Sequence, residues 1–205
     1  MLADVPRETF LALCRIRSST LDQRTRVHEA ALALGCERTA RVGWYLLLDC
    51  VAMILASVLN HFTGLQLRQA ADVVREQWKG WLELVTKAER WHEKYPTTDP
   101  MLCIAIAWLS FEEGQSQRRY RVLLGDHHEI DRALAGESIY TVNFVSIARV
   151  LHAWRDNARL ADFTWPARLT VAEGEPGYDN WRDEIRAYQE RAGARVIKTK
   201  PLTPA

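Results

Sequence analysis

Residues 10–21 read FLALCRIRSSTL, and this stretch predicts two short helices joined by a tight turn. The first helix gathers its apolar residues before the turn, and Pro6 suits its first turn, where a backbone N–H would have no partner. Residues 17–19 interrupt the apolar pattern. Ser18 or Ser19 can cap a second helix over 20–28, which has one apolar anchor, so most of its surface faces outward.

The residues that follow predict a hairpin and then two helices. Residues 32–45 alternate polar and apolar side chains and end in Trp44-Tyr45, which favours a two-stranded hairpin. Asp49 is a candidate cap for a helix over 50–60 that is apolar on nearly all sides and should be buried. A long helix is expected over 66–93.

The long helix carries a heptad pattern. Apolar residues recur at alternating spacings of four and three, which is typical of a coiled-coil seam. Two interpretations stay open: pairing between two subunits, or packing against the chain's own domain. The side chains expected to anchor a dimer are Val74, Trp78, Trp81 and Val85.

The C-terminal half predicts a small α+β module. Residues 96–100 contain two prolines and mark a boundary, because proline cannot continue a helix. Strands are expected over 101–109, 120–124, 138–144 and 163–171, with helices over 146–160 and 180–192, the last ending at Gly193. The fold class is therefore mainly α: a winged helix-turn-helix domain (1–65), a long connecting helix (66–95) and an α+β module of open role (99–205).

The N-terminal part resembles the DNA-binding part of MerR-type transcriptional regulators. The resemblance covers residues 6–92 and is carried by residues 10–21, by WYLLLD at 44–49 and by GLQLRQA at 64–70. Two departures concern the turn and the second helix. Arg15 stands where the family usually has a glycine, and Asp22-Gln23 replaces a common aromatic pair.

The resemblance implies a dimeric, sequence-specific DNA-binding regulator. Its second helix would enter the major groove, while the wing would follow the phosphate backbone or the minor groove. Six arginines against three acidic residues between positions 15 and 41 give this part a local positive excess. The expected DNA-contacting residues are Arg17, Ser19, Thr20, Gln23, Arg24, Arg26, Arg38 and Arg41. The alternative is that these arginines only keep an exposed helix and hairpin in solution.

Composition excludes several other classes of protein. The chain has 205 residues, 48% of them hydrophobic, and a formal net charge of +1, which argues against a disordered chain and against bulk attraction to nucleic acid. Its longest apolar stretch, residues 46–59, is shorter than the roughly 20 residues that span a bilayer. Four scattered cysteines predict reduced thiols. With no secretory leader in view, a cytoplasmic location without membrane contact is expected.

No motif predicts an enzyme, a cofactor or a metal site. Nucleophile-elbow, phosphate-loop, dinucleotide and HExxH patterns are absent from the sequence. Residues 126–131, DHHEID, are the densest group of metal-ligand types, but they are expected to form a solvated turn. Trp108, Trp154, Trp165 and Trp181 could line a pocket for a small molecule, although such residues are usually core.

Two further functions stay open beside the regulator. One is an assembly or adaptor protein that uses the tryptophan-bearing helix for protein contacts and binds no DNA. The weaker one is a metal-dependent enzyme built around residues 126–131. For the C-terminal module, a protein or a small-molecule partner is left open.

Overall fold

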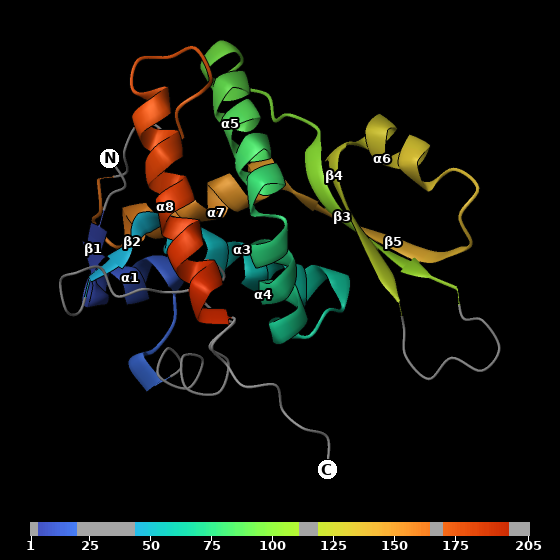
Figure 1. Cartoon of the computed structure of the whole chain (residues 1–205), viewed down its shortest axis with the longest axis horizontal. Coiled ribbons are helices and arrows are strands. Elements are labelled where there is room, and N and C mark those ends of the chain that lie inside the picture. Colours follow the sequence, from blue (N-terminus) through green and yellow to red (C-terminus); the bar gives the residue numbers. More distant parts are fainter. Residues whose placement is uncertain (1–3, 20–43, 111–118, 165–169, 197–205) are drawn as a thin grey trace.

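The computed structural model describes residues 4–19, 44–110, 119–164 and 170–196. Its elements form a helical body with a small sheet at one end and a short strand pair at the other (Figure 1). In chain order they are β1 (Asp4–Pro6), α1 (Arg7–Cys14), β2 (Trp44–Leu46), α3 (Leu47–Thr63), α4 (Leu67–Glu76), α5 (Trp78–Lys94), β3 (Leu102–Leu109), β4 (Tyr120–Asp126), α6 (His127–Leu134), β5 (Ile139–Ser146), α7 (Ile147–Leu160) and α8 (Tyr178–Val196).

The N-terminal elements pack around one apolar cluster. β1 pairs antiparallel with β2, so that Val5 lies opposite Tyr45. Phe10 of α1 stacks on the Tyr45 ring, with the ring centroids 4.4 Å apart, and both side chains are buried. A strand therefore precedes α1, and Pro6 is its N-cap rather than part of its first turn. The predicted second helix over 20–28 lies wholly outside the described residues, and of the predicted hairpin over 32–45 only residues 44 and 45, which belong to β2, are described.

The helix after β2 begins earlier than predicted. It starts at Leu47, which places Asp49 inside its first turn instead of at the cap, where a carboxylate still complements the helix dipole. Its predicted burial is confirmed: residues 50–56 are all buried. Because this helix is apolar on nearly all sides, it contributes to two clusters at once. Cys50 and Met53 face the N-terminal cluster, while Val51 and Leu55 face the main core.

The predicted long helix over 66–93 is wrong, because the chain forms two helices there. α4 ends at Glu76, Gln77 leaves helical geometry with φ −97° and ψ 18°, and α5 begins at Trp78. The break frees the carbonyl of Val74, which accepts a hydrogen bond of 2.8 Å from the buried Trp81 indole. A heptad pattern indicates which side of a helix is apolar, but it does not indicate where one helix ends and the next begins in a new direction.

The three-stranded sheet has the order β4-β3-β5 and is antiparallel throughout. Its two faces differ in side-chain size. Cys103, Ala105 and Ala107 of β3 face α6 with Ile130 and Leu134, while the larger Ile104 and Ile106 face the helical core. α5 passes close to β4 at Gly80, where a Cβ would lie 3.1 Å from a Leu124 methyl carbon.

The remaining C-terminal predictions are partly confirmed. The strands at 102–109, 120–126 and 139–146 and the helix of α7 appear where expected, with the Ser146 side chain accepting from the Arg149 N–H at the helix start. The strand predicted over 163–171 does not appear in its described residues. α8 continues past Gly193 to Val196, so that glycine does not end it.

The architecture is mainly helical with a small antiparallel sheet, which confirms the coarse fold class. The main core continues across residue 65, the expected end of the first domain, because α3, α4, α5, α7 and β3 share it. Among the described residues, no helix combines the length and the apolar character needed to cross a membrane.

Candidate functional site

A tight turn follows α1 and leads into a second helix. The Arg15 N–H bonds to the Ala12 carbonyl at 3.1 Å, and the Ile16 N–H reaches back to the Leu11 carbonyl at 3.0 Å. These two bonds, with Arg15 in the left-handed region at φ 52°, form a Schellman motif. Ser18 and Ser19 are already helical. Residues 15–17 therefore form a three-residue turn, and Ser18 and Ser19 lie in helical conformation instead of capping a helix as predicted; residues 20–28, the predicted second helix, lie outside the described ranges.

Arg7 fixes the position of this turn. Its guanidinium donates to the Ser18 hydroxyl at 3.0 Å and to the Tyr45 hydroxyl at 2.9 Å. One side chain at the start of α1 thus connects the first residue of the second helix to β2. Because guanidinium donors are planar and always charged, such a bridge holds its partners in a defined geometry. The sequence pattern gave no sign of this role for Arg7.

Two of the predicted DNA-contacting residues lie in the described part of the chain. Arg17 and Ser19 are both exposed, in the turn and at the start of the second helix. The structure brings them to the same end of that helix, where backbone N–H groups attract anions. The other six residues lie outside the described ranges: Thr20, Gln23, Arg24, Arg26, Arg38 and Arg41.

Three of the four predicted dimer anchors are buried inside the chain's own core. Val74, Trp81 and Val85 are at most 2% exposed and belong to the chain's own main core, while Trp78 packs half-buried against it. This corrects the interpretation of the heptad residues as a seam between subunits. α3, α7 and the sheet cover the apolar side of α4 and α5.

Helix α7 connects the N-terminal elements to the rest of the molecule. The Asn157 amide is buried and donates to the Leu13 carbonyl of α1 at 2.8 Å. Ala158 belongs to the N-terminal cluster, whereas Trp154, one turn earlier, belongs to the main core. The helix that carries the tight turn is therefore anchored from the C-terminal half.

The acidic and histidine-rich segment at 126–131 is structural. Asp126 accepts from the Glu129 N–H at 2.8 Å, and Glu129 accepts in return from the Asp126 N–H at 3.0 Å. This capping box starts α6, so the segment is a helix start and not the predicted solvated turn. Nearby, burial raises the pKa of the Cys103 thiol to about 11, which keeps this sulfur protonated at neutral pH.

Trp108, Trp154 and Trp181, the three members of the predicted tryptophan group that the structure describes, do not gather around one pocket. Trp154 is core, Trp181 packs half-buried against it, and Trp165 lies outside the described residues. Trp108 donates its indole N–H to the Thr63 carbonyl at 2.9 Å and lines an open hollow of about 590 Å³. Gln66, Gln69 and Asn143 also line it, so this hollow is more polar than the predicted apolar pocket.

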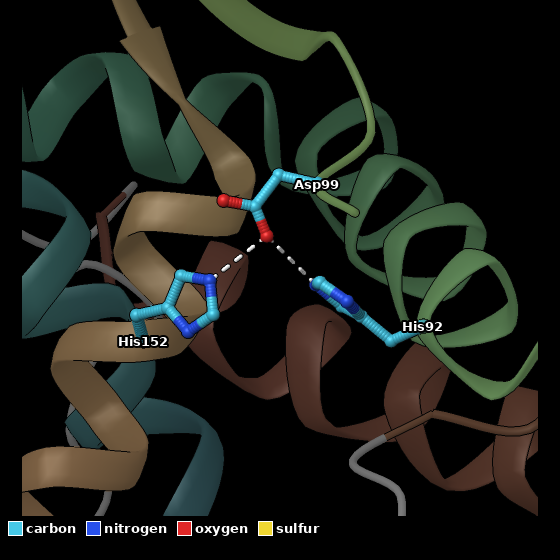
Figure 2. Close-up of side chains that lie close together, drawn as sticks. All are labelled: His92, Asp99 and His152. Carbon is cyan, nitrogen blue, oxygen red and sulfur yellow. Dashed lines mark hydrogen bonds and ion pairs between the residues drawn. The ribbon is translucent and has the colours of Figure 1, made fainter. Parts of the chain in front are cut away.

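Two histidines and one aspartate meet between α5 and α7 (Figure 2). His92 lies near the end of α5, Asp99 in the loop that follows, and His152 on α7. The Asp99 Oδ1 lies 2.9 Å from the His152 Nε2 and 3.7 Å from the His92 Nε2. Within the described ranges, no other group of three such side chains converges closely enough to hold a metal ion. Sequence reasoning missed this group because Asp99 and His152 are 53 residues apart in the chain and meet only through the fold.

Comparison with known proteins adds no assignment. No protein-family model matches the chain, and no curated protein matches it either.

Proposed function

We propose that this protein is a transcriptional regulator that binds double-stranded DNA sequence-specifically through a helix-turn-helix formed by α1, the turn at 15–17 and the helix that begins at Ser18. The observation that carries the proposal is the Arg7 bridge to Ser18 and Tyr45. It fixes the start of the second helix against α1 and β2, as a helix that enters the major groove requires. If the arginines of this part only kept an exposed helix and hairpin in solution, the second helix would not need a fixed position.

The exposed groups at this end suit phosphate contacts. Arg17 and Ser19 are both exposed, and the N-terminus of the proposed helix would offer N–H donors to a phosphate beside them. On the proposed helix, Gln23 would read adenine and Arg24 or Arg26 would read guanine. Arg38 and Arg41 would follow the backbone from the wing, consistent with the local positive excess of the sequence.

The proposal includes self-association on a roughly two-fold DNA site, because paired half-sites are the usual way for a short helix to gain specificity. It does not use Val74, Trp81 and Val85, which are buried in the chain's own core. The mass of the protein–DNA complex in analytical ultracentrifugation counts the copies that are bound.

The test is selection of bound fragments from the host's DNA at about 50 and 200 mM salt, a range over which several phosphate contacts change affinity strongly. Binding is then measured by fluorescence anisotropy on the selected site. We expect a shared motif that survives at the higher salt. We also expect the Arg24→Ala/Arg26→Ala protein to bind at least tenfold more weakly, since one bidentate base contact contributes about 1–3 kcal/mol.

The matched control is Arg119→Ala/Arg132→Ala, which removes the same charge from exposed positions near the sheet and α6, far from α1 (Figure 1). This control should keep the affinity of the unmodified protein. Fragments without a common motif, or equal losses in both double variants, would show that binding is charge alone and would refute the regulator proposal in favour of the adaptor.

A further inference from the structure

The His92 side chain presents a buried nitrogen without a hydrogen bond. This side chain is 9% exposed, and its Nε2 has no hydrogen-bond partner among the described residues. The Asp99 carboxylate oxygen lies 3.7 Å away, too far for a hydrogen bond but suitably placed for a shared ligand. Buried polar atoms nearly always have a hydrogen-bond partner or another ligand. We therefore expect this nitrogen to bind a partner that fits between the three side chains.

The loop that carries Asp99 is held in place by its own contacts. The Trp91 indole donates to the Thr98 carbonyl and to the Thr98 hydroxyl, each at 3.1 Å. The Thr98 N–H bonds to the Tyr95 carbonyl at 3.2 Å, which closes the turn after α5. The carboxylate thus faces the two imidazoles from a loop that these hydrogen bonds hold in place (Figure 2).

We propose that His92, Asp99 and His152 form a binding site for one divalent first-row transition-metal ion, for which Zn²⁺ is the probe. Two imidazoles and one carboxylate are ligands that such ions prefer, whereas Ca²⁺ and Mg²⁺ require more oxygen ligands. A tetrahedral zinc ion holds its ligand atoms about 3.3 Å apart. The separations of the Asp99 Oδ1 from the two histidine nitrogens, 2.9 and 3.7 Å, lie on either side of that distance, and all three ligand atoms lie within 4.8 Å of one another.

The fourth position would face solvent. His152 and Asp99 are 50% and 55% exposed, so a water molecule can complete the coordination. The site joins α5, its following loop and α7, and it does not depend on the proposed DNA binding. Metal binding should therefore stabilise the packing of α7, because any ligand that binds the folded chain alone raises its stability.

The experiment uses the full chain after dialysis against a chelator. Zn²⁺ is titrated by calorimetry, and a thermal melt is recorded with and without Zn²⁺. Co²⁺ serves as a spectroscopic probe, because its visible absorption reports the geometry of its ligands. We expect one ion per chain, a higher melting temperature with Zn²⁺, and no displacement by millimolar Mg²⁺.

The variants His152→Ala and Asp99→Asn remove ligands at exposed positions, and circular dichroism checks that both still fold. Each should weaken Zn²⁺ binding at least tenfold and abolish the Co²⁺ spectrum, since even the neighbours of metal ligands contribute about 10–100-fold to affinity. The matched control is His128→Ala, an exposed histidine on α6, which should bind as the unmodified protein does. Unchanged affinity in His152→Ala, loss in His128→Ala, or no saturable binding by the unmodified chain would overturn the proposal and leave a metal-free His–Asp–His cluster.

Discussion

At the residue scale, Arg15 occupies a backbone conformation that favours glycine. It is the C-terminal cap of α1 and has φ 52°. A residue with a Cβ loses roughly 1–2 kcal/mol of folding stability in this region. Glycine avoids that cost, but it makes the unfolded chain more flexible, which lowers folding stability by about 0.4–1 kcal/mol. Glycine is the common residue at such a helix end, and Arg15 nevertheless adopts this conformation, so the Schellman bonds outweigh the cost.

We therefore predict that Arg15→Gly raises the free energy of unfolding by about 0.5–1 kcal/mol, as the difference between those two effects. Urea denaturation measures it. The control is Arg15→Ala, which removes the same charge but keeps the Cβ, and which should bring no gain. Equal stabilisation by both substitutions would mean that relief of charge, not backbone conformation, is responsible.

At the element scale, the break between α4 and α5 depends on one tryptophan. The Trp81 ring is fully buried, and its N–H satisfies the Val74 carbonyl that the end of α4 leaves without a helical partner. Leaving a buried carbonyl unpaired costs about 1–3 kcal/mol. The Trp81 side chain therefore stabilises the break at Gln77.

Trp81→Phe should accordingly lower the free energy of unfolding by about 2–4 kcal/mol, from the unpaired carbonyl and the smaller ring together. Trp181→Phe is the comparison, because its indole Nε1 has no hydrogen-bond partner in the described part of the chain and its ring is half-buried. Chemical denaturation of the two variants should separate them by at least about 1 kcal/mol. Equal losses would show that ring size alone decides the outcome.

The same elements show what the sequence could and could not predict. The α7 helix, with its Ser146 cap, and the β3 strand follow from local patterns, because capping and alternation act between near neighbours. The Gln77 break does not, since the heptad pattern of 66–93 is unbroken across it. Residues 126–131 contain the capping-box spacing, so their helix start could have been predicted from Asp126 and Glu129.

The candidate sites also contain some features that the sequence predicts and others that it does not. The turn after α1 was predictable from the serines and the apolar run before them. The Arg7 bridge and the His92–Asp99–His152 cluster were not, because their members come from separate elements. Three of the four heptad anchors were assigned to the wrong partner: periodicity shows that a helix has an apolar side, but only the fold shows what covers it.

At the scale of the whole molecule, the N-terminal unit and the helical body share their cores. α3 supplies residues to both clusters, and α7 does the same through Trp154 and Ala158. The Asn157–Leu13 hydrogen bond adds a buried polar contact at this junction. Elements that share a core in this way are expected to unfold in one transition.

Asn157→Ala tests this coupling, because it deletes the donor to the Leu13 carbonyl and should lower the stability of the whole chain by about 1–3 kcal/mol. Tryptophan fluorescence and far-ultraviolet circular dichroism are followed together in urea, and both midpoints should fall by the same amount. Arg159→Ala, two residues further along α7 with a side chain 81% exposed, should change neither. If the two probes separate in Asn157→Ala, the N-terminal unit opens by itself. The turn that presents Arg17 and Ser19 would then be held by Arg7 and the local Schellman bonds, not by the C-terminal half.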